Sequence, residues 1–211
     1  LLVQSETGYR NLMRIVSRAY MEGTGEEEPQ IAIEDLTGMT DGLIALSAGL
    51  KGAVGRMLLS GREAEAAAML DSLAGLFPGR LYVELQRHFL EDENKIEGKL
   101  IDLAYAKDLP LVATNECFFA DEDMHEAHDA LICIGQGTTI GNPNRWRVTR
   151  HHRFKSAEEM RELFADLPEA VDNTIVIAQR CAFMPQKLDP ILPRFETDEG
   201  RTEEQELRAQ A

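Results

Sequence analysis

Polar side chains follow a short apolar run near the middle of the chain. Leu111-Val112-Ala113 has the length and composition of a buried parallel strand, and Thr114-Asn115-Glu116 comes directly after it. An α/β fold places its chemistry at the carboxyl ends of its strands. A carboxylate in such a position can bind a divalent cation. Glu116 is therefore the first candidate for a site residue.

Two histidines lie one helical turn apart in the segment that follows. We predict a helix here, with Asp123 as its cap and an inward apolar stripe formed by Met124, Ala127, Leu131 and Ile134. His128 lies beside this stripe, whereas His125 shares the polar side with Asp129. A core histidine and a solvated histidine explain the pair better than a shared metal ion does. The lone His88 is interpreted as structural.

The elements that must position these residues alternate between strands and helices. Short apolar runs over Leu43–Leu46, Leu81–Leu85 and Leu111–Ala113 are separated by segments of helical periodicity. A first helix has Leu12, Ile15, Val16 and Ala19 at helical spacing, which predicts that these four residues face the core. The alternation predicts an α/β fold in which the three runs are adjacent parallel strands of a layer or barrel.

Composition narrows the class of protein. With 211 residues, one large domain is expected. The formal charge of −15 and the isoelectric point near 4.7 would repel a phosphate backbone, which argues against direct DNA binding. No apolar stretch reaches the roughly 18 residues that a membrane span requires. Three widely spaced cysteines without a C-x-x-C pair argue against a disulfide framework and predict a cytoplasmic location.

One segment departs from the acidic background. Basic side chains and an aromatic ring gather in a stretch that we predict to be a loop, and they are Arg145, Trp146, Arg147, Arg150 and Arg153. This composition is typical of a nucleic-acid or partner surface. Arginines often pair with nearby carboxylates, however, so a solvated loop explains the segment as well as a partner or interdomain contact does. Direct DNA contact ranks third.

Several motifs together resemble one family. The central block resembles the T-N-D-x-H…A-H-D-x-L-x-C-I block of the PHP domain (polymerase and histidinol phosphatase) in bacterial DNA polymerase III alpha subunits. The resemblance extends, in the family's order, through further motifs: Glu6-Thr-Gly-Tyr-Arg-Asn-Leu12, Leu46-Ser47 with Leu50-Lys51-Gly52, Tyr82-Val-Glu-Leu-Gln86, and Pro190-Ile-Leu-Pro-Arg-Phe195. It implies an incomplete PHP-type (βα) barrel. Residues 1–189 would be a PHP domain without its amino-terminal strands, and residues 190–211 a linker and the start of the following polymerase region.

The resemblance also implies where a metal site would lie. PHP enzymes hold two or three divalent ions with histidine and acidic ligands, the first of which precede the block at Glu6. Three later ligand positions correspond to Gly49, Glu116 and Phe118 here, where metal-binding members have Cys, Asp and His. Glycine and phenylalanine offer no ligand atom, and the longer arm of Glu116 displaces its carboxylate. We therefore expect no metal in this part of the chain, and we expect Phe118 to fill the vacated pocket instead.

The implied function belongs to a longer polypeptide. The resemblance implies a DNA-directed DNA polymerase that uses magnesium in a downstream palm, with DNA and deoxynucleotides bound by that longer chain. This part would be a non-catalytic scaffold that packs on the polymerase core and docks a proofreading exonuclease subunit. The alternatives are a metal-dependent PHP phosphoesterase or 3′-5′ exonuclease and, more remotely, an error-prone paralogue of the polymerase. A membrane partner is not expected.

Overall fold

A four-stranded sheet forms the centre of the molecule. The computed structural model describes residues 1–22, 29–190 and 200–211. Strands β1 (Leu2–Val3), β2 (Leu43–Leu46), β3 (Leu81–Gln86) and β4 (Leu111–Thr114) lie in that order across the sheet. The pairs β2–β3 and β3–β4 are parallel, which confirms the prediction of three adjacent parallel strands. Strand β1 pairs with β2 in the antiparallel sense, so the sheet is mixed.

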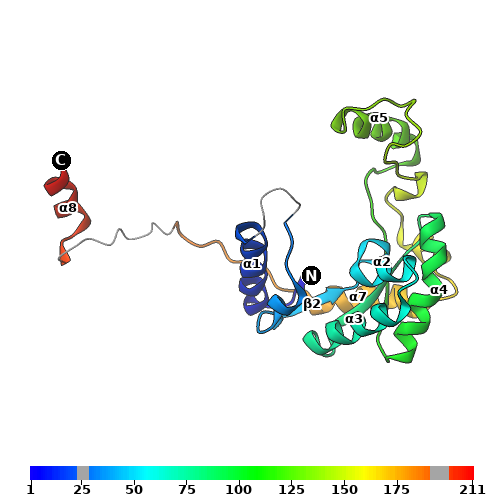
Figure 1. Cartoon of the computed structure of the whole chain (residues 1–211), viewed down its shortest axis with the longest axis horizontal. Coiled ribbons are helices and arrows are strands. Elements are labelled where there is room, and N and C mark those ends of the chain that lie inside the picture. Colours follow the sequence, from blue (N-terminus) through cyan, green and yellow to red (C-terminus); the bar gives the residue numbers. More distant parts are fainter. Residues whose placement is uncertain (23–28, 191–199) are drawn as a thin grey trace.

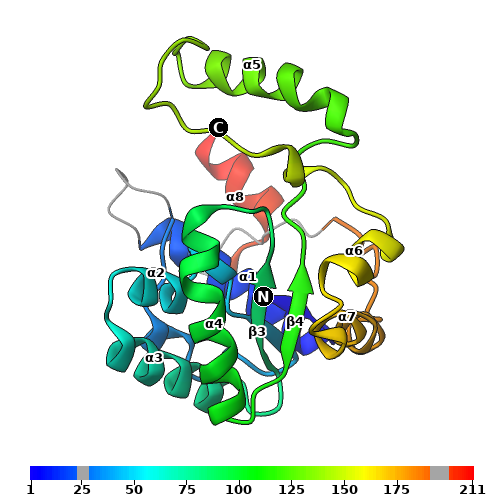
Figure 2. The ribbon, with the colours of Figure 1, turned by 90° about the vertical axis from the view of Figure 1, so that its right-hand side faces the viewer.

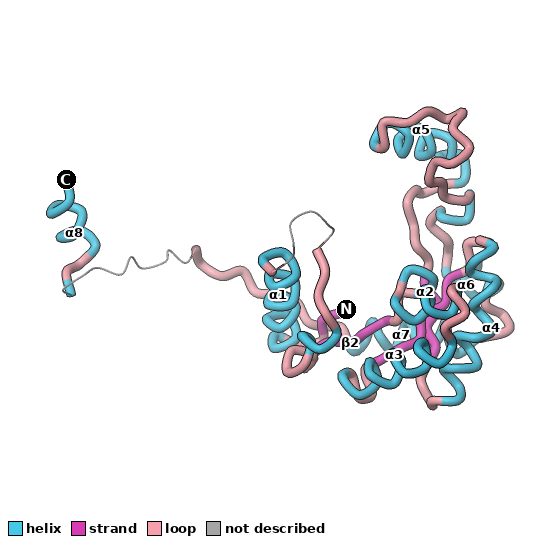
Figure 3. The backbone as a smooth tube through the Cα atoms, in the orientation of Figure 1, coloured by secondary structure: helices cyan, strands magenta, loops and turns pink. Residues whose placement is uncertain are grey.

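Helices separate the parallel strands along the chain (Figures 1 and 3). The α-helices are α1 (Glu6–Met21), α2 (Ala53–Leu59), α3 (Glu63–Leu76), α4 (Glu91–Ala106), α5 (His125–Gly135), α6 (Ala157–Leu163), α7 (Pro168–Arg180) and α8 (Glu203–Gln210). Four 3-10 turns join them: η1 (Ile33–Leu36), η2 (Gly49–Lys51), η3 (Glu122–Met124) and η4 (Arg150–His152). Among the described residues the sheet ends at β4 and does not close, so the fold is an incomplete (βα) barrel.

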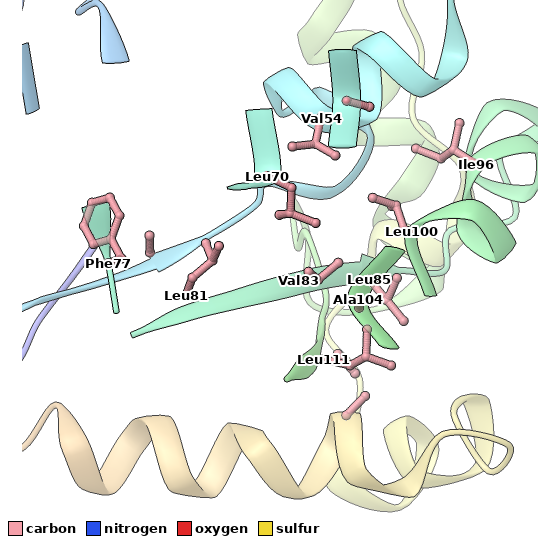
Figure 4. Close-up of a cluster of buried hydrophobic side chains, with 14 of the residues drawn as sticks. Val54, Leu70, Phe77, Leu81, Val83, Leu85, Ile96, Leu100, Ala104 and Leu111 are labelled. Carbon is pink, nitrogen blue, oxygen red and sulfur yellow. The ribbon is translucent and has the colours of Figure 1, made fainter. Parts of the chain in front are cut away.

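The main core lies between one face of the sheet and helices α2, α3 and α4 (Figure 4). Val83 and Leu111 extend from the strands toward Leu70 of α3 and Leu100 of α4, and all four side chains are almost fully buried. The helical periodicity seen in the sequence of α4 is confirmed here, because Ile96, Leu100 and Ala104 all face this core.

The opposite face of the sheet is covered by α7 (Figure 2). Ile44, Tyr82 and Val112 of the three parallel strands pack there against Ile177. Strands buried on both faces need apolar residues at nearly every position. This explains why β2, β3 and β4 are mostly apolar and do not alternate between apolar and polar residues, apart from Glu84 and the polar residues at the ends of β3 and β4.

Helix α5 belongs to an arm, residues 120–148, that extends beyond the carboxyl ends of the strands (Figures 1 and 2). The predicted inward stripe of this helix is wrong: Leu131 is 63% exposed, and Met124 and Ile134 are exposed too. Asp123 lies within η3 and does not cap α5. The helix turns Ile132 inward against Phe119 and Val148, because that side also lets His125 donate to the Val148 carbonyl and Asp129 pair with Arg145.

Helix α1 lies against β1 and β2. Its buried residues are Gly8, Asn11 and Ile15, and the Asn11 amide donates to the Asp41 carbonyl at 3.0 Å. Val16, predicted to face the core, is 46% exposed, so that prediction is wrong. The Cα of Gly8 packs so closely against the Gly42 backbone that the helix is rotated toward this contact, which turns Val16 outward.

Two sequence predictions are left open by the fold. The boundary between residues 189 and 190 is not tested, and most of the motif Pro190 to Phe195 lies outside the described residues.

A search of the described helices finds none that combines the length and apolarity of a membrane span.

Candidate functional site

Polar groups line the carboxyl edge of the parallel strands, as the sequence predicts. Strand pairing places Gln86 of β3 beside Thr114 of β4. The Gln86 amide donates to Thr114 Oγ1 at 3.2 Å, and that hydroxyl donates to Glu84 Oε1 at 2.5 Å. Ser47, which follows β2, accepts a hydrogen bond from the backbone N–H of Glu84. These groups satisfy one another across three strands and form the floor of the candidate site.

Gly49 and Glu116 flank this floor. Gly49 follows β2 with a positive φ of 48°, and a Cβ built on it would lie 3.3 Å from the Gln86 side-chain oxygen. The Glu116 carboxylate extends from the residues after β4 to Lys51 of η2, where Nζ and Oε1 are 2.5 Å apart. Lys51 was not singled out in the sequence, although it lies in one of the family motifs. Its ammonium group pairs with the one carboxylate among the positions Gly49, Glu116 and Phe118.

Phe118 lies at the junction between the arm and the body of the fold. Its ring is 5.5 Å from the His128 ring, 5.7 Å from the His152 ring and 5.9 Å from the Trp146 ring. Lys51 Nζ lies 5.8 Å from the ring centre. Phe118 is 37% exposed, so its ring is not buried in the way that the expectation of a filled pocket requires.

A pair of buried histidines lies behind Phe118. The rings of His88 and His152 stack with centroids 3.9 Å apart. His88 Nδ1 bonds to Glu93 at 2.8 Å, while its Nε2 has no partner among the described residues. His152 Nδ1 accepts a hydrogen bond from the Thr149 N–H, which leaves the proton of the neutral ring on Nε2. Burial, together with the neighbouring His88, lowers the pKa of His152 to about 4.

The five histidines of the chain all gather in this region. His125 and His128 touch Phe119, His151 lies against the exposed ring of Phe89, and His88 and His152 form the stacked pair. The structural interpretation of His88 agrees with its burial against Glu93. The sequence offered no signal for the stack, because 64 residues separate its two members and neither belongs to a metal-binding motif.

The basic segment is largely paired within the arm and its base. Arg145 is buried against Asp129 and lowers the pKa of that carboxyl group through its hydrogen bonds. Arg153 binds Glu159 and lowers the pKa of Glu159 to about 2. Arg150 lies 3.5 Å from Glu122. Exposed Trp146 and Arg147 are the members that remain open to a partner.

These residues do not fit a metal ion. Gly49 and Phe118 have no ligand atom, and Glu116 is held by an ammonium group. In the described parts of the chain, no three His, Cys, Asp or Glu side chains converge in a way that could hold a metal. A single carboxylate paired with lysine cannot replace the several oxygen and nitrogen ligands that Mn²⁺ or Zn²⁺ needs. The hydrogen bonds and the ion pair link β3, β4 and η2 at the strand edge.

The fold and the strand-edge site define the class of protein. Residues 1–88 match the family described as "PHP domain". This match agrees with the class indicated by the sequence motifs and with the open α/β barrel.

Individual relatives indicate a particular protein within this class. The chain is 49% identical over its whole length to the DNA polymerase III subunit alpha of Caulobacter vibrioides. It is 41% identical to the proteins of that name from Rickettsia bellii, over 93% of the chain, and Pseudomonas aeruginosa, over 95%. The chain spans 17–18% of the length of these relatives. It is thus homologous throughout to a segment of DNA polymerase III alpha subunits.

Proposed function

We propose that this chain is part of the alpha subunit of a replicative DNA polymerase, and that its PHP region is a metal-independent scaffold. The carrying observation is the ion pair between Glu116 and Lys51. A lysine ammonium placed on the carboxylate removes the charge that a metal would require. The other two positions, Gly49 and Phe118, supply no further ligand atom beside Glu116.

The activity proposed for the longer polypeptide is DNA-directed DNA synthesis with magnesium. It is supported by the shared name of the relatives, of which this chain spans less than a fifth. The acidic charge of −15 supports a division of labour in which DNA is bound elsewhere. In this chain, the Gln86–Thr114–Glu84 hydrogen bonds and the core beneath them would serve to hold a rigid face toward the polymerase core.

A proofreading exonuclease subunit is the partner that we propose for this scaffold. The proposal rests on the family resemblance. Trp146 and Arg147 are exposed on the arm next to Phe118 and offer an aromatic and a basic contact of the kind that protein interfaces favour.

The scaffold proposal is tested by metal analysis of the purified chain. Dialysis against Mn²⁺ or Zn²⁺ should leave no stoichiometric ion bound, and a phosphodiester substrate should not be hydrolysed above the buffer rate. Glu116→Gln should change neither result, whereas Lys51→Met should lower stability by exposing an unpaired Glu116. A stoichiometric ion that disappears in Glu116→Gln would refute the scaffold and favour the phosphoesterase.

A second prediction concerns Phe118. Phe118→Ala should lower the unfolding free energy by about 1–2 kcal/mol, because the ring packs against three other rings while remaining partly exposed. Phe118→His should also destabilise the chain, since it removes apolar area and places a third imidazole beside those of His128 and His152. Phe154→Ala removes a more exposed ring at the base of the arm and should cost less than 0.5 kcal/mol, a rough bound for surface changes.

The comparison to make is melting temperature against primer-extension rate in the full polymerase carrying each variant. Melting should fall first, and extension at low temperature should be preserved. Normal melting with loss of a nuclease signal in Phe118→Ala would show instead that the position is catalytic.

A further inference from the structure

The arm, residues 120–148, is joined to the body of the fold by a stem of two limbs, residues 115–119 and 149–155 (Figure 1). Three hydrogen bonds join the limbs to each other: the Phe118 N–H donates to the His152 carbonyl at 2.9 Å, the Phe154 N–H to the Phe119 carbonyl at 2.9 Å, and the Asn115 amide to the Arg153 carbonyl at 2.8 Å. Because these bonds hold the limbs side by side, the stem behaves as one piece.

The arm and the top of its stem also have a core of their own. Phe119, Ile132 and Val148 pack together in a cluster separate from the main core. The ion pair between Asp129 and Arg145 lies within the arm as well. A unit with its own core and its own internal pairs can change its angle to the body without unfolding. The contacts between the stem and the body therefore decide that angle.

Four rings connect the stem to the body. His88 and Phe89 follow β3, whereas His151 and His152 belong to η4 in the second limb. The His88 and His152 rings stack with centroids 3.9 Å apart, and the Phe89 and His151 rings lie 4.3 Å apart. The Thr149 hydroxyl donates to the His88 carbonyl at 2.9 Å. Two consecutive residues of the body thus hold two consecutive residues of the stem.

Two ion pairs also link the stem to its surroundings. They are Lys51 with Glu116, and Arg153 with Glu159. Each of these four side chains is at least 26% exposed, and ion pairs in contact with water contribute little. The ring contacts are consequently the ones that set the angle of the arm.

Phe89 takes part in these contacts from a strained backbone conformation. Its φ is 59°, in the left-handed region, where a bulky residue is an outlier. In extended backbone the side chains of neighbouring residues point to opposite sides. The left-handed turn at Phe89 lets its ring and the ring of His88 both contact η4. Strain of this kind persists where surrounding contacts hold it, and it is relieved when those contacts are lost.

We propose that the rings of His88, Phe89, His151 and His152 form a releasable latch between the arm and the body. In the latched state the arm extends beyond the carboxyl ends of the strands (Figure 2). In the released state Phe89 relaxes to ordinary backbone, and the stem turns about its connections to β4 and α6 while the sheet stays folded. The strain at Phe89 brings the two states closer in free energy, which is what a conformational switch requires.

The latch bears on the partner contacts proposed above. Trp146 and Arg147 lie on the arm, so the angle of the arm decides how they are presented to a partner. The latch itself rests on contacts within this chain and is measured without any partner.

The angle of the arm is measured by the electron spin resonance distance between two labels. In the 211-residue chain, the labels are attached to Leu131→Cys on α5 and Asp102→Cys on α4, both of which are exposed. Cys117→Ser and Cys181→Ser remove the native thiols that are not buried. The distance distribution should be narrow with the native latch and should gain a second population when the latch opens.

Three variants separate the ring contact from the strain. Phe89→Ala and His151→Ala each remove one ring of the same exposed pair, so both should produce the second population. Phe89→Gly removes the same ring and also the strain, so it should release the arm less, although glycine is the more flexible residue. The ratio of released to latched arm should be about fivefold larger in Phe89→Ala than in Phe89→Gly, since left-handed backbone costs a residue with a Cβ on the order of 1 kcal/mol.

Phe154→Ala is the matched control, because it removes an exposed ring of the same stem that lies outside the latch, and its distribution should stay narrow. A distribution that stays narrow in both Phe89→Ala and His151→Ala overturns the latch. A second population in Phe154→Ala overturns its assignment to these four rings. A released fraction in Phe89→Gly that equals or exceeds the one in Phe89→Ala overturns the stored strain.

Discussion

Gly8→Ala is expected to lower the unfolding free energy by about 3 kcal/mol, although it places a better helix former inside a helix. Alanine is preferred over glycine in a helix interior by about 1 kcal/mol. A Cβ on Gly8, however, would lie 1.9 Å from the carbonyl oxygen of Gly42. Gly42 is itself in the left-handed region, with φ at 73°, and a backbone turn cannot rotate away as a side chain can. Moving α1 off the sheet costs more than the helix gains.

The matched control is Gly98→Ala. Gly98 also lies inside a long helix, α4, but its added Cβ would meet no atom within 4 Å. This variant should be more stable than the wild type by about 0.5–1 kcal/mol, because only the helix preference remains. For a chain of this size the two variants should differ in melting temperature by roughly 10 °C. Equal melting temperatures would mean that α1 does not approach the Gly42 turn as closely as described.

Acid should destabilise the chain well above the pH at which its surface carboxylates titrate. His152 is neutral in the fold down to a pKa of about 4, because burial disfavours its charged form. Its ordinary value is 6.5, so between pH 6.5 and 4 the unfolded chain takes up a proton that the folded chain refuses. The stability from the neutral ring is therefore complete above pH 6.5 and is lost as the pH falls. The loss reaches about 3 kcal/mol near pH 4.

The hydrogen bonds of His152 and Glu93 also predict that the folded chain loses stability as the pH falls. Protonation of His152 at Nδ1 would remove the acceptor of the Thr149 N–H and place a charge in a ring stack with His88. Burial raises the pKa of Glu93, but its hydrogen bonds with His88 and the Leu90 N–H and the attraction to His88 together lower that pKa by more, so the net direction is downward. Protonation of Glu93 at still lower pH then removes further stability.

Urea unfolding at pH 7, 6, 5 and 4.5 tests this expectation. His152→Phe keeps a ring in the stack but cannot titrate. It should be about 1 kcal/mol less stable than the wild type at pH 7, since it loses one hydrogen bond, and should lose less stability on acidification. His151→Gln changes an exposed neighbour of His152, and the variant should lose as much unfolding free energy on acidification as the wild type does. A wild-type stability that is flat from pH 7 to 4.5 would show that the buried pair does not control acid unfolding.

Much of the fold could be predicted from the sequence, because its signals are local. Leu111–Ala113 is apolar at every position and Leu81–Leu85 at every position except Glu84, and that pattern follows from burial on both faces of a parallel sheet. The helical spacing of Ile96, Leu100 and Ala104 in α4 likewise rests on residues within a turn or two of one another. The positions Gly49, Glu116 and Phe118 could likewise be placed at the strand edge, because each follows an apolar run closely.

Tertiary structure alone decided which side of each surface helix faces inward. In α5 the sequence placed Leu131 and Ile134 in the core, yet the contacts of His125 with Val148 and of Asp129 with Arg145 turned the polar side toward the arm. In α1 the close approach of Gly8 to Gly42 turned Val16 outward. An amphipathic pattern gives the period of a helix, but when two sides are apolar the partner that packs against it selects one.

The same reason applies to the site. Lys51 and Glu116 are 65 residues apart, and His88 and His152 are 64 residues apart, so no spacing along the chain predicts either contact. The sequence by itself showed that Gly49 and Phe118 offer no ligand atom and that Glu116 is the one carboxylate among these three positions. Only the folded chain could bring the Lys51 ammonium group to Glu116 and stack His88 on His152 behind Phe118, because both contacts join segments that are far apart in the sequence.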